Sequence, residues 1–137
     1  MGECAKARKL RYVLTSLVPL GIVHEMLSKE LVAASTVPLV LSVLAEGEDY
    51  GYALIQRVRE LSDGQIEWTE GMLYPVLHRM EAQGLLESEW KEGTTGRKRK
   101  YYRICKKGKT FLRAEQTQWQ SLNKTLIKLW KTQPSST

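Results

Sequence analysis

The chain has 137 residues, of which 42% are hydrophobic and 26% charged, and its formal net charge is +6. This length suits one domain that can bury a core, and the composition excludes a disordered or collagen-like chain. The positive charge favours a polyanionic partner, such as nucleic acid or an anionic membrane surface, but says nothing about the fold.

Residues 1–26 differ from the rest of the chain. Several basic residues precede an apolar run at 13–23, VLTSLVPLGIV, which Pro19 and Gly21 interrupt. The run is too short to span a bilayer, and no small-x-small cleavage pattern follows it. We expect an N-terminal extension of unclear status: a loosely docked extra helix, or a stretch translated upstream of a functional start at Met26. A targeting segment is the less favoured alternative, and we expect no membrane partner.

The main domain is expected to span residues 27–105 and to begin with a helix. Apolar residues recur at helical spacing from Leu31 to Leu44, and the turn EGED follows them. Pro38 lies inside this pattern and has no backbone N–H to donate. The helix therefore either begins near Ser35, with Pro38 in its first turn, or is kinked at Pro38.

Two further helices are predicted between residues 51 and 84. The second helix begins at Gly51 and ends near Leu61 at the turn SDG, and its expected inner face is Tyr52, Leu54, Ile55, Val58 and Leu61. Thr69 caps the third helix, Glu70 lies in its first turn, and Gly84 ends it. The third helix is expected to bury Leu73, Val76, Leu77 and Met80. Its outer face then presents Glu70, Met72, Tyr74, His78, Arg79 and Gln83.

Two strand-like segments follow the third helix. They span Leu85–Trp90 and Lys100–Cys105, and the basic connection KEGTTGRKR joins them. Three helices followed by a two-stranded hairpin predict a mainly α (α+β) fold, the winged helix-turn-helix, with residues 27–105 as a DNA-binding domain.

Basic residues are concentrated on this hairpin and its exit. Nine Lys or Arg and no acidic residue occur between Gly93 and Ala114. A basic run is usually only a solvated face, but this one follows a helix with polar outward residues. In a winged helix, wing cations contact the phosphates of double-stranded DNA while the third helix enters the major groove. The expected wing contacts are Arg97, Lys98, Arg99 and Lys100.

The last helix is predicted over residues 106–131, before a disordered tail at 132–137. Its seam has spacings of three and four and consists of Leu112, Glu115, Trp119, Leu122, Leu126 and Leu129. Phe111, Ile127 and Trp130 widen the stripe. Such a helix most often packs on its own domain, but this heptad pattern favours pairing with a second copy. The expected homodimer interface is Leu112, Trp119, Leu122, Leu126, Leu129 and Trp130.

No catalytic, metal or cofactor site is predicted. The sequence has neither a phosphate-binding glycine-rich loop nor a convincing nucleophile with a base partner. Cys4 and Cys105 are far apart, and with two His in the chain they show no metal-ligand spacing. We therefore expect a cytoplasmic protein with reduced thiols and no enzymatic activity.

Three ordered motifs carry a family resemblance. They are YGYAL at 50–54, EGMLYPVLHRMEAQGLLESEW at 70–90 and GRKRKYYRICKKG at 96–108. Together they resemble the PadR family of bacterial transcriptional regulators over about residues 31–130. The short single C-terminal helix resembles the subfamily that senses toxic or drug-like small molecules.

The resemblance implies a homodimeric repressor that binds a DNA operator and is released by an aromatic or lipophilic, drug-like effector. By the family pattern, the residues at or near DNA are Tyr52, Gly71, Met72, Tyr74, Pro75, His78 and Arg79, with Gly96, Arg97, Lys98 and Arg99 on the wing. A Trp at the position of Trp119 lines a ligand pocket between subunits in the short-helix subfamily. The plainer alternatives are that Tyr74 and Pro75 shape the helix, that His78 caps or packs, and that Trp119 is only an interface residue.

The chain departs from the family pattern at two positions. Met72 and Cys105 stand where the family usually has Thr. A thioether at Met72 replaces a hydroxyl that can bond to phosphate or base, which is expected to alter operator preference. A thiol at Cys105 is a poor N-cap, so the last helix is expected to begin late or to fray.

Two other functions are compatible with the sequence alone. The wing of an interaction module would meet an acidic protein, and a small-molecule carrier would have lost its DNA binding. A steep loss of binding with salt and a preferred DNA site separate the regulator from the first alternative.

Overall fold

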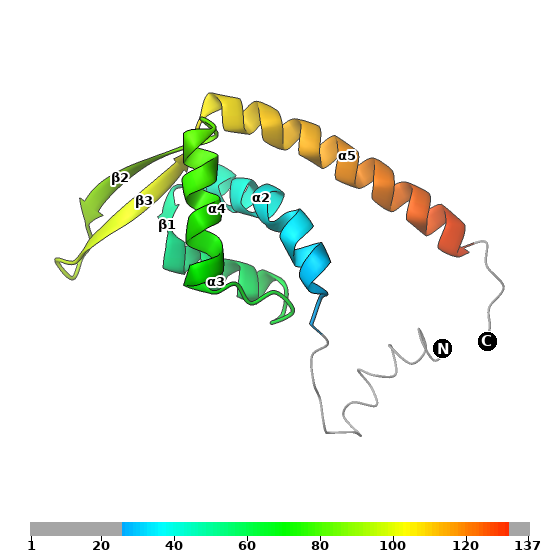
Figure 1. Cartoon of the computed structure of the whole chain (residues 1–137), viewed down its shortest axis with the longest axis horizontal. Helices are drawn as coiled ribbons and strands as arrows, with labels where there is room; N and C mark the ends of the chain where they lie inside the picture. Colours follow the sequence, from blue (N-terminus) through cyan, green and yellow to red (C-terminus); the bar gives the residue numbers. More distant parts are fainter. Residues whose placement is uncertain (1–25, 132–137) are drawn as a thin grey trace, which may run out of the picture. The chain divides into compact units, whose positions relative to one another are not determined.

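The computed structural model describes residues 26–131, so the predicted extension up to residue 25 and the predicted tail at 132–137 lie outside the described residues. The described part contains, in order, α2 (Lys29–Glu46), β1 (Asp49–Tyr50), α3 (Gly51–Leu61), α4 (Glu70–Ala82), β2 (Leu86–Glu92), β3 (Lys98–Ile104) and α5 (Lys106–Lys131) (Figure 1). Met26–Gln118 forms one compact unit, and Trp119–Lys131 belongs to another, which is described by itself below. The first unit has the predicted mainly helical winged-helix architecture.

Helix α2 begins well before its proline. The Ser28 side chain caps it by accepting a hydrogen bond from the Leu31 N–H at 3.2 Å, and the helix continues through Pro38. A start near Ser35 is therefore wrong. Leu31, at 52% exposure, lies outside the buried face, which consists of Thr36, Val40, Leu41, Val43 and Leu44.

Helix α3 buries a narrower stripe than expected. Its buried positions are Gly51, Leu54, Ile55 and Val58, whereas Tyr52 is 49% exposed and Leu61 is 56% exposed. Residues two apart on a helix point to nearly opposite sides, which turns Tyr52 away from the face that carries Leu54. Leu61 is the last residue of the helix. Assigning Tyr52 and Leu61 to the inner face was therefore wrong.

Helix α4 has the predicted boundaries. The Thr69 hydroxyl accepts a hydrogen bond from the Met72 N–H at 3.2 Å, and Gly84 follows the helix with a φ of +81°. Such a positive φ favours glycine, which explains the stop. Leu73, Leu77 and Met80 are fully buried, and Val76 packs partly against the same core, as predicted.

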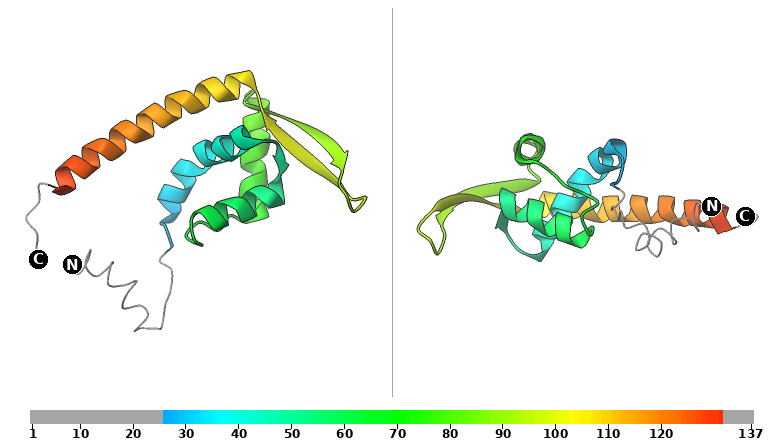
Figure 2. Two further views of the ribbon diagram at one scale, coloured as in Figure 1. Left: turned by 180° about the vertical axis from the view of Figure 1, so that it is seen from behind. Right: turned by 90° about the horizontal axis from the view of Figure 1, so that it is seen from below.

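The sheet has three strands rather than the two predicted. Strand β1 pairs antiparallel with β3, which also pairs with β2, so the order is β1–β3–β2. The turn assigned to EGED thus ends in a strand that starts at Asp49. Strands β2 and β3, with the connecting residues 93–97, form a hairpin that we call the wing. In both views of Figure 2 the wing extends beyond α3 and α4.

The hydrophobic core lies between the sheet and helices α2, α3 and α4. Its members are Val40, Leu41, Val43, Leu44, Leu54, Ile55, Val58, Ile66, Trp68, Leu73, Leu77, Met80, Leu85, Leu86, Tyr102, Ile104 and Leu112. Leu112 is contributed by α5 and is only 7% exposed. The first turns of α5 therefore belong to the winged domain, which fixes where that helix leaves the sheet.

Helix α5 begins at Lys106, directly after Cys105, so the expected late start is wrong. Backbone bonds set the start: the Cys105 N–H donates to the Leu85 carbonyl, and the Cys105 carbonyl accepts from the Lys109 N–H, both at 2.9 Å. Cys105 is a free thiol. Within residues 26–131, no helix combines the length and hydropathy that a bilayer crossing requires.

Candidate nucleic-acid interface

A groove opens between the N-terminus of α3, one face of α4 and the wing. Its volume is about 580 Å³. The lining residues are Tyr50, Gly51, Tyr52, Glu70, Tyr74, His78, Trp90, Arg97, Lys98, Arg99, Lys100 and Tyr102. We call this the wing groove. Five aromatic residues and four consecutive cations line it against one carboxylate, so it is both positively charged and rich in flat apolar surface.

The α4 wall of the wing groove is one stripe of the helix. Glu70, Tyr74 and His78 are four residues apart, a spacing that places side chains on the same helical face. Pro75 is exposed within this helix, and Gly71 is exposed near its start. His78 is also exposed, so its ring is accessible at the groove surface.

Tyr74 is fixed by a close approach to α3. A Cβ built on Gly51 would lie 2.5 Å from ring atom Cε1 of Tyr74, so the tyrosine ring fits only because position 51 has no side chain. Burial of the ring, assisted by the Glu70 carboxylate, raises the pKa of Tyr74. The hydroxyl therefore stays protonated at neutral pH and keeps its capacity to donate a hydrogen bond.

The wing wall carries the cations, and stacking orders one of them. The guanidinium carbon of Arg99 lies 4.3 Å from the centroid of the Tyr50 ring. Tyr50 in turn meets Tyr101 edge to face, with centroids 5.4 Å apart. Cation–π contacts of this kind hold a guanidinium in place without neutralising its charge.

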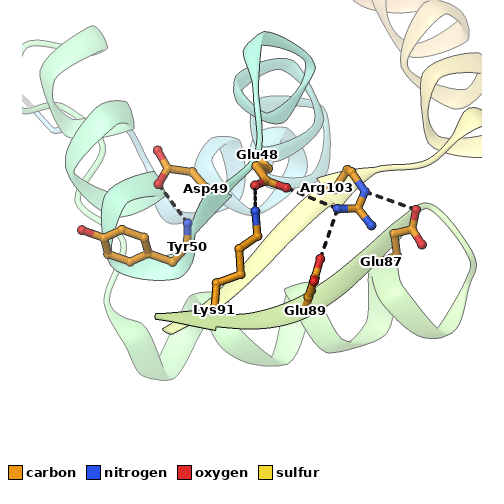
Figure 3. A network of polar contacts seen from close by, with 7 residues as sticks. All are labelled: Glu48, Asp49, Tyr50, Glu87, Glu89, Lys91 and Arg103. Atoms are coloured by element: carbon orange, nitrogen blue, oxygen red, sulfur yellow. Dashed lines mark hydrogen bonds and ion pairs between the residues drawn. The ribbon is translucent and has the colours of Figure 1, made fainter. Parts of the chain in front are cut away.

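A second set of contacts ties the wing to the turn before β1 (Figure 3). The Glu48 carboxylate accepts hydrogen bonds from Lys91 and from Arg103, the latter at 3.2 Å. Arg103 also reaches Glu87 at 3.4 Å and Glu89 at 3.7 Å. The hydrogen bond from Lys91, and then the interactions with Arg103, lower the pKa of Glu48. This network links the segment that follows α2 to both strands of the wing.

Glu81 makes the corresponding connection on the α4 side of the wing. Its carboxylate accepts a hydrogen bond from the Ser88 hydroxyl at 2.7 Å and lies 3.8 Å from the Lys100 ammonium. Tyr102, in β3, is buried, and this burial raises the pKa of its hydroxyl to about 12. The wing is thus held on both faces, which fixes its distance from α4.

The ion pairs sort the wing cations into two groups. Lys91, Lys100 and Arg103 are engaged with Glu48, Glu81, Glu87 or Glu89. In contrast, none of the ion pairs within residues 26–131 involves Arg97, Lys98 or Arg99. These three charges, at the tip and the inner edge of the wing, are the ones available to an external anion.

Most of the residues predicted to contact DNA lie together. The wing groove contains Tyr52, Tyr74, His78, Arg97, Lys98, Arg99 and Lys100. Gly71, Met72 and Arg79 do not line it: Gly71 and Arg79 are exposed elsewhere on α4, and Met72 packs partly against the core. Tyr74 packs against the core as well, so neither Met72 nor Tyr74 is a free outward side chain.

Sequence reasoning missed several lining residues, above all Trp90. It is 64% exposed and lies on the face of the wing that looks into the groove. The strand alternation of Leu86, Ser88 and Trp90 was a signal for this placement, because the first of these is buried. Tyr50 and Gly51 were also missed, since their roles depend on Arg99 and Tyr74, far away in the sequence.

Three helices, a hairpin wing and a cationic groove between wing and third helix define a winged helix-turn-helix protein of the DNA-binding type. Residues 40–114 match the model of the transcriptional regulator PadR-like family. The chain belongs to this family of transcriptional regulators.

Individual relatives agree with this assignment. The chain is similar to the crystal structure of a PadR family transcriptional regulator from Eggerthella lenta, at 36% identity and a TM-score of 0.63, over 92% of this chain and 99% of that one. It is also similar to a PadR-like transcriptional regulator from Bacillus cereus, at 28% identity and a TM-score of 0.69, over 77% and 100% of the two chains. A transcriptional regulator of Mycobacterium tuberculosis is 35% identical over 88 residues, 64% of this chain and 78% of that protein.

Proposed function

We propose that the protein is a cytoplasmic homodimeric repressor that binds a double-stranded DNA operator and is released by a small aromatic or lipophilic effector. The observation that carries the proposal is the wing groove, where Arg97, Lys98 and Arg99, which take part in no ion pair within the described residues, stand beside the exposed face of α4. The proposed DNA contacts are Tyr52, Gly71, Met72, Tyr74, His78, Arg79, Arg97, Lys98, Arg99 and Lys100.

The two walls of the groove have different tasks in this proposal. Wing cations neutralise phosphates and release condensed counterions, which supplies affinity that depends strongly on salt. Side chains of α4 meet base edges in the major groove and supply sequence selectivity. Met72, being partly buried, contributes mainly by shaping the start of α4.

A salt titration of DNA affinity tests the proposal. Fluorescence anisotropy of a labelled duplex is expected to show affinity falling steeply with salt, and Arg97→Ala and Lys98→Ala are each expected to reduce the log–log slope by about one. Arg59→Ala is the matched control, because Arg59 pairs with Glu67 at 3.7 Å and does not line the wing groove. Tight, sequence-selective binding with an unchanged slope in both wing variants would contradict the assignment.

The second half of α5 supports the proposed dimer. Within Trp119–Lys131, Leu122, Leu129 and Trp130 are more than half exposed, at 54%, 56% and 59%. Apolar side chains at heptad spacing on an exposed helix favour pairing with a second copy. The proposed interface is Trp119, Leu122, Leu126, Leu129 and Trp130. Leu112 is left out because it is buried in the core of its own domain.

The effector is proposed to stack on Trp119 within this interface and to change the spacing of the two winged domains. A spacing that misfits half-sites about one helical turn apart releases the operator. Planar aromatic cations are expected to quench tryptophan fluorescence in the native chain and to lose that quench in Trp119→Phe.

The dimer interface is tested separately by sedimentation equilibrium of Leu122→Glu, which should be a monomer. A dimer that survives this substitution would contradict the proposed seam.

A further inference from the structure

Trp90 is the most exposed of the large hydrophobic side chains that stand out at the surface of residues 26–131. It lies in β2, directly opposite Lys100 of β3, and it lines the wing groove. Because Leu86 and Tyr102 on the same face of the sheet are buried, this face turns toward α4 at the wing's base. The wing carries Trp90 past the end of the core, where the indole remains uncovered.

The neighbours of Trp90 leave its ring open. The ammonium of Lys100 lies 3.8 Å from Glu81 and 5.6 Å from the centroid of the Tyr102 ring, so it is directed to the base of the wing. Among the described residues, the aromatic and cation–π contacts of the sheet involve Tyr50, Tyr101 and Tyr102 but not the indole of Trp90. An exposed indole with no cover inside its own domain marks a surface for a partner.

The charges around the indole of Trp90 indicate what kind of partner could cover it. Trp90 shares the groove with Arg97, Lys98 and Arg99, which no described acid neutralises, and with a single lining carboxylate, Glu70. A polyanion with apolar surface between its charges fits this arrangement. In duplex DNA, the deoxyribose carbons lie beside each phosphate, within reach of an aromatic side chain whose neighbours hold the phosphates.

We infer that Trp90 is a DNA contact of the wing that packs on the deoxyribose of the backbone gripped by Arg97 and Lys98. This inference rests on the proposed DNA binding and adds to it an apolar, sequence-independent contribution. Because the indole carries no charge, it releases no counterions, so its contribution is independent of salt. Burying about half of an exposed indole corresponds to roughly tenfold in affinity.

The experiment compares affinity and salt slope in the same titration. A labelled mixed-sequence duplex is titrated with the native chain, Trp90→Ala, Trp90→Phe and Arg97→Ala at several salt concentrations. Trp90→Ala is expected to weaken binding about tenfold with an unchanged slope, and Trp90→Phe to recover part of the loss. Leu61→Ala is the matched control, because it removes another exposed apolar side chain outside the groove and should leave affinity unchanged.

A spectroscopic measurement reports the contact directly. DNA is expected to shield part of the tryptophan emission of the native chain from acrylamide, and Trp90→Phe should remove that shielding. Thermal unfolding of the Trp90 variants close to that of the native chain shows that the exposed residue was removed without damage to the fold.

The outcomes separate this inference from the proposed function. Unchanged affinity in Trp90→Ala, together with a reduced slope in Arg97→Ala, overturns the Trp90 contact and leaves DNA binding standing. A Trp90→Ala loss accompanied by a smaller slope also overturns it, since the indole would then act by placing the cations. Absence of salt-dependent binding in the native chain, with capture of an acidic polypeptide instead, overturns both proposals.

Discussion

Gly108 joins α5 to the sheet so closely that adding one methyl group is expected to destabilise the winged domain. The residue is buried in the third position of α5. A Cβ at this position would lie 2.3 Å from the Leu85 carbonyl oxygen and 2.9 Å from Cγ1 of Ile104. The Leu85 carbonyl cannot turn away freely, because it accepts the Cys105 N–H at 2.9 Å.

The expected change in the free energy of unfolding for Gly108→Ala is the sum of opposing contributions. Ordinary van der Waals contact begins at 3.4 Å, so the first turn of α5 must move by about 1 Å. Overpacking of this kind costs about 1–3 kcal/mol, and weakening of the Cys105 hydrogen bond adds roughly 1 kcal/mol. Alanine's helix propensity returns about 1 kcal/mol. The expected net loss for Gly108→Ala is therefore about 1–3 kcal/mol, or roughly 5–15 °C in Tm.

Two other glycines in helices provide matched controls. A Cβ at Gly71 in α4 would meet no atom within 4 Å beyond its chain neighbours and the backbone of its own helix, so Gly71→Ala should leave stability unchanged or raise it by up to about 1 kcal/mol. The three atoms nearest to a Cβ at Gly51 all belong to the side chain of Tyr74, and the stability of Gly51→Ala is expected to fall between those of the other two variants. The assay is urea and thermal unfolding followed by circular dichroism at one fixed protein concentration, because the proposed dimerisation would make stability depend on concentration. Gly108→Ala as stable as Gly71→Ala would refute the reasoning.

Two further substitutions probe contacts that hold the groove in shape. Glu48→Gln removes the ion pairs with Lys91 and Arg103. Because the pKa of folded Glu48 lies below its ordinary value of 4.5, the stabilisation is present above that pH and lost as pH falls through the folded pKa. The Tm difference from the native chain should therefore be seen at pH 7 and shrink as the pH falls below 4.5; a pH-independent difference would point to packing instead. Thr69→Ala removes the cap of α4 and should lower the free energy of unfolding by about 1 kcal/mol, with Thr69→Ser restoring it. Equal urea midpoints for Thr69→Ala and the native chain would contradict the capping role.

The sequence alone predicted structure correctly where neighbouring residues determine it, as they do for the two ends and the buried face of α4. The cap at Thr69 and the stop at Gly84 act through neighbouring backbone groups, so α4 was placed within a residue of its bounds. The spacing of Leu73, Leu77 and Met80 likewise identified the buried face correctly. These features depend on helix geometry alone and not on what the helix packs against.

The sequence alone did not predict features that depend on contacts between residues far apart in the chain. Strand β1 is two residues long and exists because it pairs with Tyr101 and Tyr102 of β3, so no local periodicity could predict it. How wide a helix face becomes buried is likewise set by its neighbours, which explains the errors at Tyr52 and Leu61. Tyr74 points toward a glycine in another helix, a relationship that only the fold creates.

The basic run illustrates how structure refines a correct inference from composition. The count of nine cations between Gly93 and Ala114 correctly indicated a cationic wing but treated all of them alike. Arg103 and Lys100 are engaged with glutamates, and the Lys107 ammonium donates to the Gln83 carbonyl at the end of α4 at 2.9 Å. These cations build the domain, which leaves Arg97 and Lys98, together with stacked Arg99, to face a polyanion. Charge removed from the first group should therefore lower stability, whereas charge removed from the second should lower the salt slope of DNA binding and leave stability nearly unchanged.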